Sequence, residues 1–318
     1  MFDRSKIDFE VEKVPLWHYD SGELGFEALD NDMCQLIRRK DTKQPLGSVG
    51  GGYKMLQYTV IVDDVEKALK ASGLKLDNAV FETNVYKMGS QLELTARFYD
   101  HNTDIDGTGV VTPEFKFRTS HNSTWANNGM MGLWRSACYN TLPSGNKLAY
   151  VYGRHTKDFN MTAFAAKIRT AGEYIRGDGM DTMKRWFHTR IHRSNAELLF
   201  SETLAKRIEN VKRKNKPNQV ILSQLMNTFD EETRMCHGKG LYQGKNTTEY
   251  GSLWTAYQAA THWSTFKDRK LLENSKSLDP QNIRVNREAA VRKMIKSSHW
   301  REWEDGWSPN TWVSVNNE

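Results

Sequence analysis

The chain has 318 residues, a net charge of +6, and 38% hydrophobic and 26% charged residues. This length is enough for one large domain or two smaller ones, each with a real core. The sequence excludes a membrane-spanning helix, since no apolar run approaches roughly 18 residues, and its charged N-terminus excludes a signal peptide.

Three cysteines, Cys34, Cys138 and Cys236, lie far apart, and none belongs to a CxxC pair. This spacing indicates neither a disulfide framework nor a zinc knuckle, so a reducing compartment is expected. Cys138 lies within an apolar run, where a buried structural thiol is expected rather than a reactive one.

The N-terminal part reads as acidic and irregular up to residue 45, with a short helix expected over 31–38. The glycines of LGSVGGGYKMLQ lack the Lys-Ser/Thr that follows a phosphate-binding loop, so they predict a bulge or tight turn between strands. Apolar and aromatic alternation continues through Tyr58 and Val60. Asp63 is then expected to cap one short helix over 63–71.

Three strands are predicted between residues 78 and 118, and the first two join in a tight hairpin at Gly89-Ser90. In the second and third strands, apolar residues alternate with polar ones, which is typical of half-buried antiparallel strands. Arg97, Lys116 and Arg118 fall at polar positions, and we expect them to share the open face of one sheet. The segment 145–155 is expected to close that sheet.

The stretch 119–142 lies where the strand pattern gives way to a helical one, and it mixes basic, aromatic and amide groups. His121, Trp134 and Arg135 are its candidate binding residues. Cations along a backbone track, together with aromatic rings that stack on bases, are how single strands are held without sequence preference. Trp134 is the predicted stacking ring.

From Phe159 the apolar period becomes helical, and a long helix is predicted over 181–211. A later helix over 249–266 carries Trp254, Tyr257 and Trp263, which are expected in the core rather than as base-stacking platforms. The basic residues predicted to add positive field along the long helix and at its end are Lys184, Arg185, Arg190, Arg193, Lys212, Arg213 and Lys214.

The positive charge is concentrated in one segment. Residues 167–216 contain 13 Lys and Arg against 6 Asp and Glu, so the rest of the chain is close to neutral. This surplus indicates a polyanion footprint, and the alternative is a solvated helix face.

No metal site is predicted. In the loop DHNTDIDGTG, Asp104 and Asp106 alternate, but a calcium loop counted from Asp104 would need Glu at its twelfth position, where Phe115 stands. His188 and His192 have metal-ligand spacing on one helical face, without the Glu that follows the first His of a zincin motif. We therefore expect an acidic turn, a basic helix face and no cofactor.

The predicted fold class is α+β, with an N-terminal antiparallel curved sheet and a short helix, followed by a mainly helical C-terminal half. We divide the chain into a β-rich core (1–156), a helical part packed on the core (157–270) and a charged C-terminal tail (271–318), which is a docking arm or a covering segment.

Four passages resemble the phage/plasmid-like domain-of-unknown-function family: VEKVPLWH, LGSVGGGYKMLQ, SHNSTWANNG…RSACYNTL and YGSLWTAYQAATHW. They span most of the chain in matching order and spacing. The chain departs from the family pattern at Asn122-Ser123, where Asp-Gly is common, and at Gln258, where Asn is more frequent.

The resemblance implies kinship with the Red-beta, Erf and Rad-fifty-two-like single-strand annealing proteins, which hold single-stranded DNA on a basic groove of a small curved sheet. It therefore implies a non-enzymatic protein of the host bacterial cytoplasm that anneals strands without ATP in phage recombination or replication. A homo-oligomeric ring or filament and a phage exonuclease partner are implied as well, with no membrane association.

Two alternatives stay open. One is a phage interaction protein that does not bind DNA, whose basic segment only keeps it soluble. The other is a metal-dependent nucleic-acid enzyme that uses Asp104, Asp106 and His121 around a divalent ion.

Overall fold

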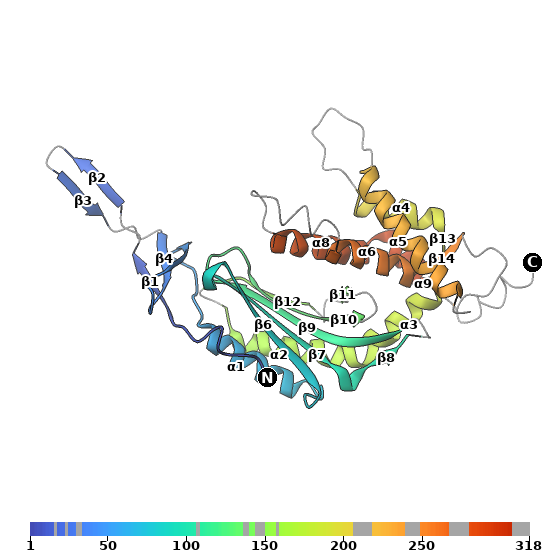
Figure 1. Ribbon diagram of the computed structural model, residues 1–318, viewed down its shortest axis with the longest axis horizontal. Coiled ribbons are helices and arrows are strands. Elements are labelled where there is room, and N and C mark those ends of the chain that lie inside the picture. The colour runs from blue at the N-terminus through green and yellow to red at the C-terminus, as the bar shows by residue number, and fades with distance from the viewer. Residues whose placement is uncertain are drawn as a thin grey trace, which may run out of the picture. The chain divides into compact units, whose positions relative to one another are not determined.

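The computed structural model describes residues 1–15, 18–22, 25–29, 34–105, 109–135, 140–143, 150–156, 159–205, 218–238, 249–266 and 280–306. The α+β class is confirmed, since an antiparallel sheet forms first and helices dominate the later half (Figure 1). The chain divides into two compact units. The first comprises Met1–His101, Pro113–Gly132 and Asn146–Arg176, and the second comprises Asn102–Thr112, Leu133–Gly145 and Gly177–Glu318.

Among the described residues the strands fall into four sheets, and the largest has the order β11-β10-β9-β7-β6, with β12 paired to β10 and β8 to β9. The smaller sheets are β1-β4-β5, β2-β3 and β13-β14. The strands are β1 (Val11–Pro15), β2 (His18–Gly22), β3 (Gly25–Leu29), β4 (Cys34–Arg39), β5 (Pro45–Gly50), β6 (Ala79–Tyr86), β7 (Gln91–Phe98), β8 (Thr103–Asp104), β9 (Val110–Ser120), β10 (Asn127–Arg135), β11 (Asn140–Pro143), β12 (Tyr150–Gly153), β13 (Arg190–His192) and β14 (Tyr250–Ser252).

The helices of the first unit, α1 (Tyr58–Ala71) and α2 (Met161–Tyr174), pack on one face of the large sheet (Figure 1). Their apolar stripes are buried, with Val65 and Leu69 on α1 and Ile168 on α2 among the buried residues. Gly172 lets the two helices approach, because a Cβ there would lie 2.7 Å from the Cβ of Ser72 at the end of α1.

The second unit is built around aromatic residues. The Trp186 ring meets the rings of Tyr257 and Trp300 edge-on, with centroid distances of 5.0 Å in both cases. Trp254, Tyr257 and Trp263 are buried, which confirms their expected place in the core. Trp300 is also fully buried, so this part of the predicted C-terminal tail covers the core. The helices are α3 (Met180–His188), α4 (Arg193–Thr203), α5 (Gln219–Gly238), α6 (Leu253–Phe266), α8 (Pro280–Met294) and α9 (Ser298–Asp305).

Three expectations for secondary structure were wrong. The segment expected to be helical near residues 31–38 contains β4, which pairs with β1 and β5. The strand pattern expected through Val60 gives way to α1, which begins at Tyr58 rather than Asp63. The long helix predicted over 181–211 is interrupted by β13, which pairs with β14. In the third case the partner strand, Tyr250–Ser252, is far away along the chain, and local periodicity does not reveal it.

The hairpin between β6 and β7 is confirmed, and its turn has an unusual backbone. Lys87, Met88 and Gly89 have φ angles of 51°, 59° and 105°, so three consecutive residues lie in the left-handed region. Such angles are costly for residues with a Cβ, whereas Gly89 adopts its φ without that penalty. The Met88 side chain is 75% exposed at the tip of this turn.

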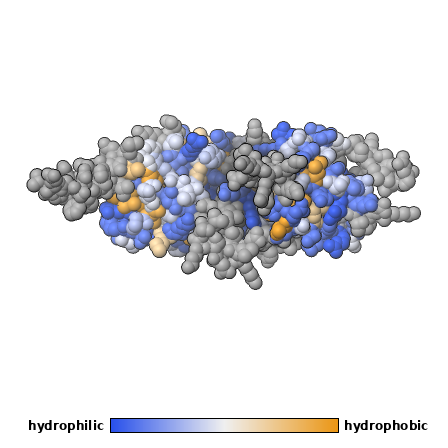
Figure 2. All heavy atoms as spheres, turned by 90° about the horizontal axis from the view of Figure 1, so that it is seen from above, coloured by the Kyte–Doolittle hydropathy of each residue, from blue (hydrophilic) through white to orange (hydrophobic). Residues whose placement is uncertain are grey.

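The domain boundaries predicted at residues 156 and 270 stay predictions, because a division by compactness does not test independent folding. Helix α2 belongs to the first unit, and the strands β8 and β11 belong to the second. On the face drawn in Figure 2, hydrophilic residues dominate the described surface, and the hydrophobic ones form small separate patches. Within the described ranges, no helix has both the length and the apolar character needed to cross a membrane.

Candidate nucleic-acid interface

The large sheet of the first unit has one apolar and one polar face. The Phe117 ring on β9 meets the Phe164 ring of α2 at a centroid distance of 5.6 Å, so Phe115 and Phe117 point toward α2. Because side chains alternate along a strand, Lys116 and Arg118 point to the opposite face. The paired strand β7 alternates in the same way, with Leu92, Leu94, Ala96 and Phe98 on the apolar face.

The strand register confirms that Arg97, Lys116 and Arg118 share one face. Arg97 lies opposite Glu114, Thr95 opposite Lys116, and Glu93 opposite Arg118. On the other side of β7, Glu82 lies opposite Thr95, so its carboxylate is on the same face. We call the six charged side chains of this face the charge ladder: Glu82, Glu93, Arg97, Glu114, Lys116 and Arg118.

The charge ladder corrects the expectation of an open cationic face. The Arg118 and Lys116 side chains are only 6% and 8% exposed. Arg118 Nε lies 2.6 Å from Glu93 Oε2, and Lys116 Nζ lies 3.2 Å from Glu114 Oε1. Buried charges are costly to desolvate, so they persist where an opposite charge lies beside them. The ladder therefore compensates its own charge, and direct phosphate contact by these cations stays a prediction.

Arg97 connects two carboxylates of the charge ladder. Its Nε donates to Glu114 Oε2 at 2.8 Å, and its second guanidinium nitrogen donates to Glu82 Oε1 at 2.6 Å. Burial alone would lower the pKa of Arg97, but the two neighbouring carboxylates outweigh it and raise that pKa above its ordinary value. The side chain is 19% exposed, which makes it the most accessible of the three predicted cations on this face.

His121 is a buried neutral ring in this structure. It is 2% exposed and stacks on Tyr58 of α1, with a centroid distance of 4.0 Å and an interplanar angle of 20°. Burial, with a smaller contribution from His155, lowers the pKa of His121 to about 3. Its Nε2 has no hydrogen-bond partner in the described part of the chain. A phosphate-binding role for His121 is therefore not favoured by its surroundings.

Two of the passages that carry the family resemblance meet in the first unit. The Tyr53 hydroxyl donates to the backbone carbonyl of Ser120, and Gly47 lies against Asn122. These two segments are far apart in the sequence. Their contact explains glycine at position 47, because Asn122 leaves no room for a Cβ there.

Replacing Gly47 with Ala should destabilise the protein by about 1–3 kcal/mol through overpacking. The new Cβ would lie 2.5 Å from the Asn122 Cβ and 2.7 Å from its Cα, and backbone cannot move aside cheaply. Urea denaturation followed by circular dichroism measures the loss. Gly52→Ala is the matched control, because a Cβ there meets nothing within 4 Å. Equal stabilities of the two variants would contradict the packing argument.

Of the other residues predicted to bind nucleic acid in the stretch 119–142 and at 212–214, the structure describes the side chain of Trp134. Trp134 is 9% exposed, which leaves little of the ring for a base to stack on. The side chain of Arg135 lies outside the described residues, as do Lys212, Arg213 and Lys214.

The four predicted cations of the interrupted helix lie in the second unit. Lys184 and Arg185 are on α3, and the Arg185 side chain is 50% exposed, with its nearest carboxylate at 3.9 Å. Arg193 donates from two nitrogens to the Asp230 carboxylate, both at 2.9 Å, so its charge is compensated. The guanidinium of Arg190 lies 6.0 Å from the ring centroid of Tyr250.

The interruption of the predicted helix also separates its two histidines. His188 is the last residue of α3, whereas His192 precedes α4 and accepts a hydrogen bond from the Ser194 N–H. Among the described residues, no group of three or more His, Cys, Asp or Glu side chains is arranged to hold a metal ion. Asp104 accepts the Gly109 N–H at 3.1 Å, as in an ordinary acidic turn, and Asp106 lies outside the described residues.

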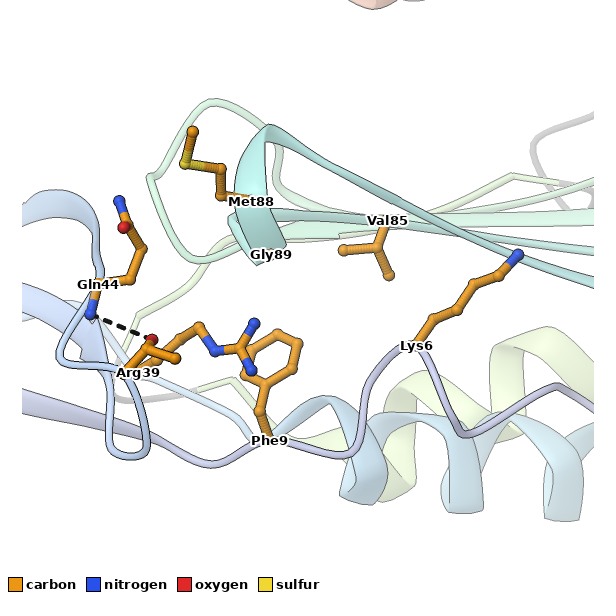
Figure 3. Close-up of a pocket in the computed structure, with 8 residues that line it drawn as sticks. Lys6, Phe9, Arg39, Gln44, Val85, Met88 and Gly89 are labelled. Atoms are coloured by element: carbon orange, nitrogen blue, oxygen red, sulfur yellow. Dashed lines mark hydrogen bonds between the residues drawn. The ribbon is translucent and has the colours of Figure 1, made fainter.

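A pocket of about 360 Å³ lies beside the β6–β7 turn (Figure 3). The Arg39 guanidinium lies over the Phe9 ring, 4.2 Å from its centroid, and is also paired with Asp41 at 2.6 Å. Lys6 donates to the Thr83 carbonyl at 3.0 Å. The lining includes none of the residues predicted to bind nucleic acid, so this pocket is separate from the candidate interface.

Sequence reasoning missed two exposed side chains of the first unit. Tyr152 on β12 is 51% exposed, and Arg154 just after it is exposed as well. The strand expected over 145–155 contains them, and β12 pairs with β10 as anticipated for a strand that closes the sheet. The alternation of Val151 and Gly153 with Tyr152 and Arg154 was the signal that could have found them.

The model of the family described as domain of unknown function (DUF932) matches residues 45–291. The chain belongs to this family. The expected membership of a domain-of-unknown-function family is therefore confirmed at that level.

The DUF932 match begins at β5 and extends into α8, so it contains every candidate residue of the interface as well as Tyr152 and Arg154. The strands β1 to β4 and the helix α9 lie outside it. Neither the curated proteins nor the solved structures contain a match to this chain.

Proposed function

We propose that this DUF932 protein binds single-stranded DNA and anneals complementary strands without ATP, in phage recombination or replication. The supporting observation is the location of the positive charge, since residues 167–216 hold 13 Lys and Arg against 6 Asp and Glu. Concentrated positive charge attracts a phosphate backbone and releases its counterions. The same proposal includes self-assembly of this chain into a ring or filament and a phage exonuclease as its partner.

The architecture of the first unit is compatible with the proposal. A curved antiparallel sheet has α1 and α2 on one face and a polar, charge-bearing face on the other (Figure 1). This is the arrangement that the resemblance to single-strand annealing proteins implies. Because the charge ladder is internally compensated, we assign the phosphate contacts to exposed cations such as Arg185 on α3.

Fluorescence anisotropy with a labelled poly-dT oligonucleotide, at low and at moderate salt, tests binding. Acceleration of the pairing of two complementary labelled strands, measured without ATP, tests annealing. We expect binding that weakens steeply with salt, together with faster annealing. Binding without annealing would reduce the protein to a single-strand binder. Absence of binding at low salt would reject the proposal in favour of an interaction protein without DNA affinity.

The double variant Lys184→Gln, Arg185→Gln should weaken binding to poly-dT and flatten its salt dependence. Each lost phosphate contact lowers the slope of log affinity against log salt by about 0.7 for single strands, so the expected change is about 1.4. The charge-matched control is Lys70→Gln, Lys75→Gln, which removes two exposed cations from the end of α1 and the loop after it. Equal effects of both double variants would show that net charge alone drives binding.

A further inference from the structure

Tyr152 stands on the polar face of the large sheet, at its β12 edge. A Cβ on Gly129 would lie 3.7 Å from Val151 and from the Phe164 ring of α2, so Gly129 and Val151 face the helix. A Cβ on Gly153 would lie 2.4 Å from the Phe159 ring, near the same helix. Tyr152 lies between Val151 and Gly153, so its side chain points to the opposite face.

That opposite face is the one that carries the charge ladder. Strand β12 pairs with β10, and β10 pairs with β9, which carries Lys116 and Arg118. Adjacent strands are about 4.8 Å apart, so the backbone of β12 lies two strand spacings, roughly 10 Å, from that of β9. The ring is 51% exposed, and no other aromatic ring of the described chain packs on it.

Arg154 follows two residues later and is exposed. Unlike the cations of the charge ladder, it makes no ion pair with any described residue. Within the part of the chain that the structure describes, its positive charge therefore has no carboxylate partner, and Arg154 lies only two residues along the chain from an exposed aromatic side chain. A ring that can stack on a base, beside a cation that can meet a phosphate, matches the chemistry of a single nucleic-acid strand.

We propose that Tyr152 and Arg154 form a binding site in which one base of a single strand stacks on the Tyr152 ring and the phosphate of that nucleotide contacts Arg154. This inference rests on the proposed function and names residues that perform it. It also replaces Trp134 as the stacking ring, since Trp134 is only 9% exposed. Among the residues whose exposure the structure describes, Tyr250 is the next most exposed aromatic at 39%, but its ring already lies beside Arg190 and His192.

The test uses the full chain and two labelled oligonucleotides of equal length, poly-dT and an abasic strand with the same phosphates. Wild type should bind poly-dT more tightly than the abasic strand, because only poly-dT offers a base to stack. Tyr152→Ala should weaken binding to poly-dT on the order of tenfold and leave binding to the abasic strand unchanged. Tyr152→Phe keeps the ring and should bind both strands as wild type does.

Arg154→Gln should weaken binding to both strands equally, and the slope of log affinity against log salt should fall by about 0.7. Circular dichroism and thermal melting show whether each variant folds. Tyr152→Leu, which keeps an apolar side chain on β12 but has no ring, replaces Tyr152→Ala if the latter unfolds. A merely structural role for Tyr152 would lower affinity for the two strands alike.

The outcomes separate the inference from the function on which it rests. If wild type binds neither strand, the proposed function fails. If wild type binds poly-dT and Tyr152→Ala binds it equally well, the proposed function stands and the proposed binding site at Tyr152 and Arg154 is overturned. Loss of affinity by Tyr152→Ala for both strands would likewise overturn base stacking at this ring.

Discussion

Replacing Glu93 with Gln should destabilise the protein by about 3–5 kcal/mol, because it breaks the buried ion pair between Glu93 and Arg118 by neutralising one member. The two side chains are 4% and 6% exposed, and 2.6 Å separates Arg118 Nε from Glu93 Oε2. The free energy of unfolding, from urea denaturation followed by circular dichroism, measures the effect.

The double variant Glu93→Leu, Arg118→Met is the control for this pair. Removing both charges together leaves the net charge of this face unchanged, and apolar replacements of buried ion pairs are often neutral or stabilising. We expect it to be more stable than Glu93→Gln. If Glu93→Gln has the stability of wild type, the buried charge of Arg118 does not depend on Glu93, which would contradict this prediction.

The His121→Phe variant should lose part of the acid sensitivity of wild type. The pKa of His121 is about 3 in the folded protein and about 6.5 in an unfolded chain, so unfolding takes up a proton between these values. Wild-type stability therefore falls as pH drops below 6.5, by about 1.4 kcal/mol for each pH unit from this residue. This contribution amounts to about 2 kcal/mol between pH 6.5 and pH 5.

Urea denaturation at pH 8 and at pH 5 compares the two proteins. Phenylalanine keeps the stack on Tyr58, and no hydrogen bond of Nε2 is lost because it makes none within the described chain. The variant should therefore match wild type at pH 8 and exceed it at pH 5. The same loss of stability in both proteins between the two pH values would show that His121 is not buried as the structure has it.

The sheet was largely predictable because its signals are local. Alternation along β7 and β9 separates the two faces, and the hairpin signal at Gly89 fixes which strands pair. The same reasoning failed at Arg190–His192, where the apolar pattern of a helix continues through a strand. There β13 pairs with β14, about 60 residues away along the chain, and such a distant partner leaves no mark on the local period.

The candidate site was predictable in part for the same reason. Parity along β9 places Glu114, Lys116 and Arg118 on one face, but it does not show that Glu93 and Arg97 of β7 lie beside them. That depends on the register between strands and on burial, and neither is written in the alternation. Exposure determines which aromatic ring a base can reach, and the sequence does not show exposure. Trp134 is buried, whereas Tyr152, which is also aromatic, is half exposed.

The charge ladder also bears on how the sheet folds correctly. Sliding β9 by two residues along β7 would keep every apolar side chain on the helix-covered face, so burial alone would not oppose this slip. A slip in one of the two directions would bring Arg97 opposite Lys116 and would leave Glu93 opposite Ser120, in place of the pairs in the native register. Two like charges would meet where there is little water to screen them. The ladder therefore distinguishes between two alignments that the hydrophobic pattern leaves equivalent.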